Sequence, residues 1–160
     1  MKYAGLLKND FINGEGVCVS VWLQGCPFHC EGCHNPSTWD REGGKEIDEE
    51  EFIDEILDAL YANGLLRNLS ILGGEPLAPW NRDFSNRLAF LAKKRYPNIK
   101  VFLWTGYLLE EVAPYINSSI DVVIDGPFVL ANRNITLKLR GSPNQRIWRR
   151  DKNGQFQRNN

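Results

Sequence analysis

Short apolar runs alternate with longer and more polar segments along this chain. The short runs are rich in β-branched and aromatic residues and predict buried strands at residues 17–23, 69–72, 100–104 and 120–124. Helices are expected between these strands, at about residues 81–95 and 109–116 and in the segment that follows Asp48. Strands that alternate with helices predict βα units around a parallel sheet, so the expected fold class is α/β. About four to five such units are expected, too few for a closed eight-stranded barrel.

The first predicted helix lies in a strongly acidic region. Asp48 is its expected N-cap, Glu51 is a reciprocal capping-box partner, and Gly64 is expected to cap its C-terminus. Apolar residues recur at helical spacing within it, at Phe52, Ile53, Ile56, Leu57 and Leu60. The acidic side chains are therefore interpreted as the solvated face of a helix rather than as a metal site.

Length and composition predict an ordinary globular domain. The chain has 160 residues, of which 42% are hydrophobic and 24% charged, so a single domain over residues 1–160 is expected. Its net charge of −1 predicts no bulk affinity for nucleic acid or anionic membranes. No apolar run approaches the roughly 20 residues of a membrane span, and no signal peptide is evident, so a cytoplasmic location is expected. About residues 150–160 are polar and expected to be mobile.

Three of the four cysteines, Cys26, Cys30 and Cys33, fall on one short loop with the spacing C-x3-C-x2-C. Such crowding indicates metal binding in a reducing compartment. Three thiolates are one short of a closed tetrahedral site. The same three can hold an iron–sulfur cube with one iron open to a substrate. The fourth cysteine, Cys18, lies among β-branched residues of a strand and is expected to be a small buried hydrophobe.

A small zinc-binding module is the main alternative from another class of protein. In that reading Cys18, His29 or His34 would complete the set of four ligands. The two interpretations predict different colours, because a zinc protein is colourless and an iron–sulfur protein is brown.

Several motifs follow the ends of predicted strands. They are the cysteine loop, Gly73-Gly74-Glu75, Thr105-Gly106 and Asp125-Gly126. Ligands of α/β proteins bind beyond the carboxyl ends of the strands. The four loops are therefore expected to converge on one mouth.

Together with further short motifs, these residues resemble a known family. The further motifs are residues 13–16, 35–39, 73–76, 125–128 and 140–146. The cysteine spacing is similar to that of radical S-adenosylmethionine enzymes. The whole set, in this order over nearly the full length, resembles the activating proteins of anaerobic ribonucleoside-triphosphate reductases. The resemblance implies a partial, open (βα) barrel.

The resemblance also implies a mechanism and a set of site residues. Cys26, Cys30 and Cys33 would hold a 4Fe–4S cluster, and S-adenosylmethionine would chelate the open iron. An electron from the cluster would then cleave the cofactor to methionine and a 5′-deoxyadenosyl radical. The residues implied to border S-adenosylmethionine are Gly32, Cys33, His34, Gly73, Gly74 and Glu75.

The implied substrate is a protein, the large subunit of the anaerobic ribonucleoside-triphosphate reductase, from which the radical would remove a glycine Cα hydrogen. A reductant such as flavodoxin would supply the electron. Another glycyl-radical activase, such as that of pyruvate formate-lyase, is the nearer alternative, although this chain has no second cysteine cluster. The basic residues beyond position 137 are either a docking surface for the partner or a contribution to solubility.

Overall fold

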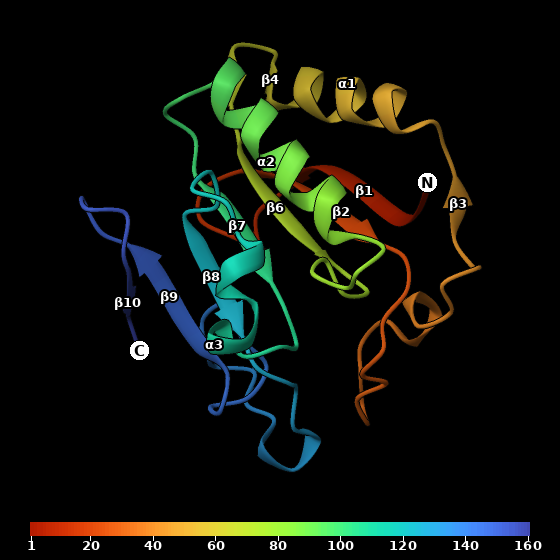
Figure 1. The fold of residues 1–160 in the computed structure, drawn as a ribbon, viewed down its shortest axis with the longest axis vertical. Coiled ribbons are helices and arrows are strands. Elements are labelled where there is room, and N and C mark those ends of the chain that lie inside the picture. The colour runs from red at the N-terminus through yellow and green to blue at the C-terminus, as the bar shows by residue number, and fades with distance from the viewer.

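A computed structural model describes residues 1–160 of the protein. The fold is built around one mixed β-sheet. Its strands are β1 (Lys2–Asp10), β2 (Cys18–Leu23), β3 (Lys45–Glu46), β6 (Asn68–Gly73), β7 (Val101–Trp104), β8 (Val122–Asp125), β9 (Arg146–Arg150) and β10 (Phe156–Arg158). They lie in the order β10-β9-β8-β7-β6-β2-β1-β3 (Figure 1). Two further short strands, β4 (Tyr61–Ala62) and β5 (Leu65–Leu66), form a separate hairpin.

The centre of the sheet is parallel and its flanks are antiparallel. Strands β2, β6, β7 and β8 run in the same direction, whereas β1 and β9 pair antiparallel to their neighbours. Helices α1 (Glu49–Leu60), α2 (Arg82–Arg95) and α3 (Leu109–Val112) lie in the three crossovers between the parallel strands. The structure is thus α/β with a mixed sheet and three helix-containing crossovers rather than four to five units. The curvature of a partial barrel stays a prediction.

The helices pack on one face of the sheet, where they cover an apolar core (Figure 1). Alternate residues of β2, namely Val19, Val21 and Leu23, belong to that core and are fully buried. The other residues of β2 point to the opposite face. On that face the loop before β2 packs closely, since a Cβ added to Gly14 would lie 2.6 Å from the sulfur of Cys18.

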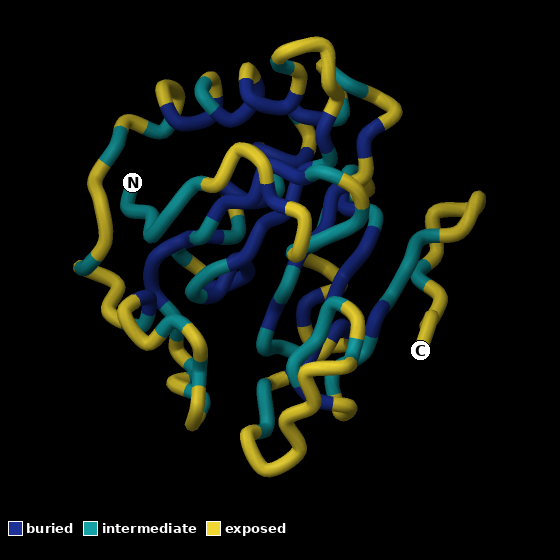
Figure 2. The backbone as a smooth tube through the Cα atoms, turned by 180° about the vertical axis from the view of Figure 1, so that it is seen from behind, coloured by how far each residue is buried: buried dark blue, intermediate teal, exposed yellow.

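Loops rather than helices cover the second face and its carboxyl edge. The cysteine loop and the segment after β8 both extend from the end of the sheet at which the parallel strands terminate (Figure 1). Seen from behind, these two loops are largely exposed, whereas the central strands are buried (Figure 2). A second, smaller apolar cluster lies on this side, formed by Phe102, Val122, Ile124 and Ile147.

The predicted first helix ends earlier than its sequence suggests. Asp48 is the N-cap as expected, with its side chain accepting a hydrogen bond from the Glu51 backbone N–H at 3.1 Å. The helix stops at Leu60, however, and Gly64 is not its C-terminal cap. Asn63 and Gly64 have φ of 53° and 74° and form the two-residue turn of the β4–β5 hairpin.

Two other expectations also differ from the structure. The third helix ends at Val112 and continues as a 3₁₀ turn over Ala113–Tyr115, where Pro114 cannot donate to the helical ladder. The polar C-terminal segment contains strand β10, which pairs with β9. Strand β9 was not predicted either, because its sequence Arg-Ile-Trp-Arg-Arg is dominated by charge.

Candidate active site

The cysteine loop is closed at its base by backbone hydrogen bonds. The Gly25 N–H donates to the Thr38 carbonyl at 2.7 Å, and the Cys26 N–H donates to the Trp39 carbonyl at 3.1 Å. Beneath them, the buried amide of Gln24 donates to the carbonyls of Ser37 and Asp40, both at 2.8 Å. The two ends of the loop are thereby fixed to each other directly after β2.

The three cysteines lie on a compact turn within this loop. The Cys33 N–H donates to the Cys30 carbonyl at 3.1 Å, and His29 and Gly32 adopt positive φ values of 48° and 75°. The Asn35 N–H donates to the Cys33 sulfur at 3.4 Å. Cys26, Cys30 and Cys33 are all free thiols of intermediate exposure. Burial raises the pKa of the Cys26 thiol.

A second loop, the Gly73-Gly74-Glu75 loop after β6, is hydrogen-bonded to the first. The Gly74 N–H donates to the Leu23 carbonyl at 3.0 Å, and the Glu75 N–H donates to the Gly25 carbonyl at 2.9 Å. A Cβ added to Gly74 would lie 2.5 Å from the Gly25 carbonyl oxygen. The close approach of the cysteine-loop backbone is therefore sufficient reason for a glycine at position 74, beside any contact with S-adenosylmethionine that the resemblance implies.

The carboxylate of Glu75 is buried and holds a third loop in place. Its Oε1 accepts hydrogen bonds from the Leu77 N–H at 2.9 Å and the Thr105 hydroxyl at 2.7 Å. Its Oε2 accepts from the Gly106 N–H at 2.7 Å. Burial raises the pKa of Glu75 from 4.5 to about 7, although these hydrogen bonds favour the charged form. Glu75 thus joins the loops after β6 and β7.

The three loops border one cavity of about 660 Å³. Its lining includes seven of the predicted site residues: Cys26, Cys30, Cys33, His34, Gly73, Gly74 and Glu75. Gly32 does not line the cavity; a Cβ on it would lie 2.6 Å from Leu130. Its glycine is explained by a positive φ and by this contact.

Some cavity residues were not identified from the sequence. Trp104, Phe128 and Arg140 line it, as do several residues of the segment after β8. Trp104 lies in an apolar run and resembles an ordinary core residue, whereas Phe128 and Arg140 belong to the motifs at residues 125–128 and 140–146. The aspartate of the Asp125-Gly126 turn does not line the cavity. It is buried, pairs with Arg146 and accepts from the Leu109 N–H.

The chain is similar in sequence to a family of iron–sulfur proteins and to several named proteins. Residues 12–148 match the family model of a 4Fe–4S single cluster domain. The chain is 36% identical over 151 residues to the anaerobic ribonucleoside-triphosphate reductase-activating protein of Enterobacteria phage T4, covering 92% of this chain and 94% of that protein. The proteins of the same name from Vibrio cholerae and Escherichia coli K12 are 34% and 32% identical, over 93% and 91% of this chain and 98% and 96% of their own lengths.

This chain belongs to the family of anaerobic ribonucleoside-triphosphate reductase-activating proteins. It is an enzyme of that family and contains a 4Fe–4S cluster domain. No helix in it has the length and apolarity needed to cross a bilayer.

The residues around the cavity fit an iron–sulfur cofactor. Three free cysteines line the same cavity, and thiolates are the usual ligands of such clusters. The match of residues 12–148 to a 4Fe–4S cluster domain favours the cluster over the zinc module.

Cys18 is separated from the three motif cysteines by the length of β2. It is fully buried at the start of that strand, whereas the motif follows the strand's end. Its thiol donates to the Glu15 carbonyl at 3.4 Å, and it does not line the cavity. This position agrees with a structural role.

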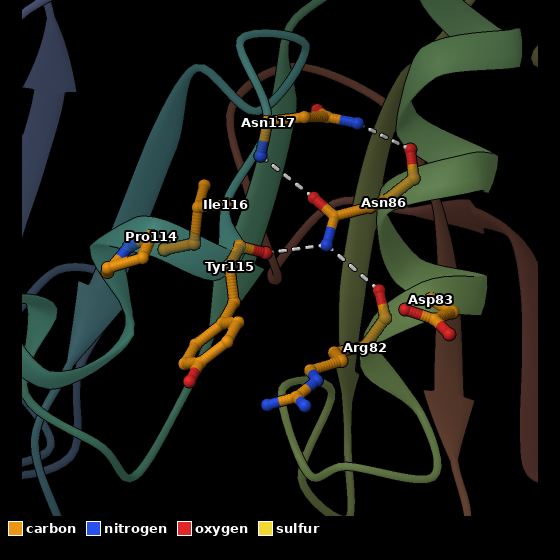
Figure 3. A pocket seen from close by; sticks show the side chains of 7 residues that line it. All are labelled: Arg82, Asp83, Asn86, Pro114, Tyr115, Ile116 and Asn117. Carbon is orange, nitrogen blue, oxygen red and sulfur yellow. Dashed lines mark hydrogen bonds between the residues drawn. The ribbon is translucent and has the colours of Figure 1, made fainter.

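A smaller cavity of about 330 Å³ lies elsewhere, between α2 and the turn after α3 (Figure 3). Asn86 crosses it, donating to the carbonyls of Arg82 and Tyr115 at 2.9 and 2.6 Å. Asn117 donates two hydrogen bonds to Asn86. Its backbone N–H donates to the Asn86 side-chain oxygen at 2.9 Å, and its side-chain amide donates to the Asn86 backbone carbonyl at 2.8 Å. These mutual bonds indicate a joint between two elements rather than a second reaction site.

Proposed function

We propose that this chain generates a glycyl radical on an anaerobic ribonucleoside-triphosphate reductase, using a 4Fe–4S cluster and S-adenosylmethionine. The observation that carries the proposal is the shared cavity, which brings the three motif cysteines together with the Gly73-Gly74-Glu75 loop. The names of the relatives favour the reductase as target over pyruvate formate-lyase.

In this proposal Cys26, Cys30 and Cys33 would hold the cluster, and S-adenosylmethionine would bind in the same cavity, against Gly73, Gly74 and the neighbourhood of His34. The cluster and S-adenosylmethionine would together supply a one-electron cleavage of a carbon–sulfur bond, which gives methionine and a 5′-deoxyadenosyl radical able to take a hydrogen atom from the target glycine. The protein contributes ligands, placement and electrostatics, while the cofactors carry the bond cleavage.

Glu75 has two roles in the proposal. Its three hydrogen bonds fix the loops after β6 and β7 at one side of the cavity. Its buried carboxyl group also lies in the cavity wall, where its ionised form would favour a positive charge beside it. S-adenosylmethionine carries such charges at its sulfonium and its amino group.

The donor set and the charge support further parts of the proposal. A reductant such as flavodoxin would supply the electron. All four cysteines are unpaired, which suits a reducing compartment, so the proposed location is the cytoplasm. The net charge of −1 gives no reason to expect nucleic acid or membrane as a partner.

The test is anaerobic reconstitution with iron and sulfide, followed by reduction and addition of S-adenosylmethionine and the reductase. The expected results are a brown protein, formation of 5′-deoxyadenosine, and a glycyl radical signal by electron paramagnetic resonance. Cofactor cleavage without a glycyl radical would refute the reductase as substrate. A colourless product would refute the cluster.

Single replacements of Cys30 and Cys18 by alanine test the ligand assignment. The Cys30→Ala variant is expected to lose its cluster and the Cys18→Ala variant to keep it, as measured by iron content and visible absorbance. Equal losses in both variants would overturn the assignment of Cys26, Cys30 and Cys33 as the ligands.

A further inference from the structure

The chain exposes three large apolar side chains far more than the others. Phe11, Ile12 and Ile135 are 73%, 81% and 85% exposed, whereas the next, Tyr61, is 55% exposed. They lie on two loops that are distant in sequence, yet Ile12 and Ile135 both line the cavity that contains the motif cysteines. We call residues 11–13 and 130–140 together the rim.

Hydrogen bonds hold the apolar tips of the rim outward. On the first loop, the buried Asp10 carboxylate accepts from the backbone N–H groups of Ile12 at 2.8 Å and Asn13 at 3.2 Å. On the second, the Asn134 side chain accepts from the Thr136 N–H at 3.0 Å, which leaves Ile135 at the tip of a turn. Apolar side chains held in water in this way are unfavourably hydrated, and a partner that covers them would gain free energy of binding from their burial.

The second loop is also attached to the sheet and to itself. The Trp104 indole donates to the Leu139 carbonyl at 2.7 Å, and the Asn134 N–H donates to the Gly141 carbonyl at 2.9 Å. The tip of the loop is thus presented by a fixed base. A surface prepared in this way lowers the ordering cost of binding a partner.

The second loop of the rim carries positive charge and no acidic residue. Residues 130–140 contain Arg133, Lys138 and Arg140 and no Asp or Glu. None of the three takes part in an ion pair within the chain. A partner that brings acidic groups would therefore be attracted to this side of the cavity.

We propose that the rim is the docking surface for the glycine-bearing segment of the reductase, and that this segment presents apolar side chains flanked by acidic ones. The inference rests on the proposed function. A segment held between the two loops of the rim lies over the cavity, which places a glycine at its middle above the motif cysteines. A second copy of this chain is a poorer occupant, because it would cover the cavity that the substrate has to enter.

The experiment uses the reconstituted chain with two substitutions that lie on the rim but do not line the cavity, Phe11→Ser and Lys138→Glu. Binding to immobilised reductase is measured anaerobically, together with 5′-deoxyadenosine formed in the absence of reductase. Reductase binding is expected to weaken at least about tenfold. Cofactor cleavage without reductase is expected to stay within about twofold of the wild type, and the salt dependence of binding to decrease.

Phe90→Ser is the matched control, because Phe90 is also exposed, at 53%, but lies on α2, on the helix-covered side of the sheet. It should bind reductase as the wild type does. A second rim variant, Ile12→Ser with Ile135→Ser, should weaken reductase binding to a similar degree.

The outcomes separate the two proposals. Wild-type binding by the Phe11→Ser, Lys138→Glu variant, or an equal loss in the Phe90→Ser control, would overturn the rim as docking surface while the glycyl radical still forms. A wild-type chain that cleaves S-adenosylmethionine but neither binds nor activates the reductase would overturn the proposed function, and the docking proposal with it.

Discussion

The two faces of the central sheet are built differently. On the helix side, twenty-three buried apolar residues form one continuous core. On the loop side, a cluster of four buried residues adjoins a cavity of about 660 Å³ and a set of hydrogen-bonded turns. The strands are shared, because alternate residues of each strand serve opposite faces.

The helix-covered face contributes mainly to stability, whereas the loop-covered face contains the candidate active site. Close packing on the helix side removes much apolar surface from water, which is the main favourable term in folding. The loop side gives up part of that packing and leaves the cavity in which the proposed cofactors and substrate would bind. Its loops are held by directional bonds, such as those of Glu75 and Gln24, instead of by apolar contact.

The largest expected effect comes from Leu→Ala replacements on the two faces. Leu103 is fully buried in the helix-side core, so Leu103→Ala should lower the free energy of unfolding by roughly 2–5 kcal/mol. Leu72 lines the cavity, where part of its side chain already lacks packing partners. Leu72→Ala should therefore lower the free energy of unfolding clearly less than Leu103→Ala does. Anaerobic urea unfolding of both variants measures the difference, and equal losses would contradict the division between faces.

Glu75→Gln tests the buried carboxylate through the pH dependence of stability. The pKa of Glu75 is raised in the folded chain, from 4.5 to about 7, so the folded state holds the proton more tightly than the unfolded state. The associated stability is present below pH 4.5 and is lost as the pH rises to about 7. The loss is on the order of 3 kcal/mol.

The Glu75→Gln variant cannot ionise and should lack this part of the slope. Unfolding free energies of both proteins between pH 4.5 and 8 provide the measurement, and their difference removes the contributions of all groups that the two proteins share. Parallel curves would show that the carboxylate titrates normally.

Gly74→Ala tests the contact between the cysteine loop and the loop after β6. The added Cβ would lie 2.5 Å from the Gly25 carbonyl oxygen, so one of the two loops must move. We expect a loss of about 1–3 kcal/mol in unfolding free energy and a lower iron content after reconstitution. Gly5→Ala, where the nearest atom to an added Cβ would be a Trp22 side-chain carbon at 3.8 Å, is a control for added volume at a glycine. Normal iron content in Gly74→Ala would show that the contact is not needed for the cluster.

The smallest effect is expected far from the cavity, at the start of α1. Asp48→Ala removes the side-chain acceptor of the Glu51 backbone N–H and should lower the free energy of unfolding by about 1 kcal/mol. Thermal unfolding followed by circular dichroism measures it. Iron content and cofactor cleavage should not change, and a change in either would contradict the separation of the two faces.

Local patterns predicted the regular elements near the centre of the sheet. Strands β2, β6, β7 and β8 lie within one or two residues of the predicted apolar runs, because buried strands need near-continuous apolar sequence. The flanking strands were less accessible to prediction. Strand β9 carries three arginines that pair or bond with distant groups, such as Asp125 and the Ile120 carbonyl, and those partners are set by the fold.

The sequence by itself determined the residues on which the proposed chemistry rests, namely three thiols on one short loop and the glycine-rich motif, and an order of motifs that identified the family. These are local, because ligand spacing and turn residues act over a few positions. Only the tertiary structure decided that Gly74 faces the Gly25 carbonyl, that Gly32 faces Leu130, and that the two loops of the rim border one cavity. Such contacts join residues that are far apart along the chain, and their geometry follows from how the whole sheet packs.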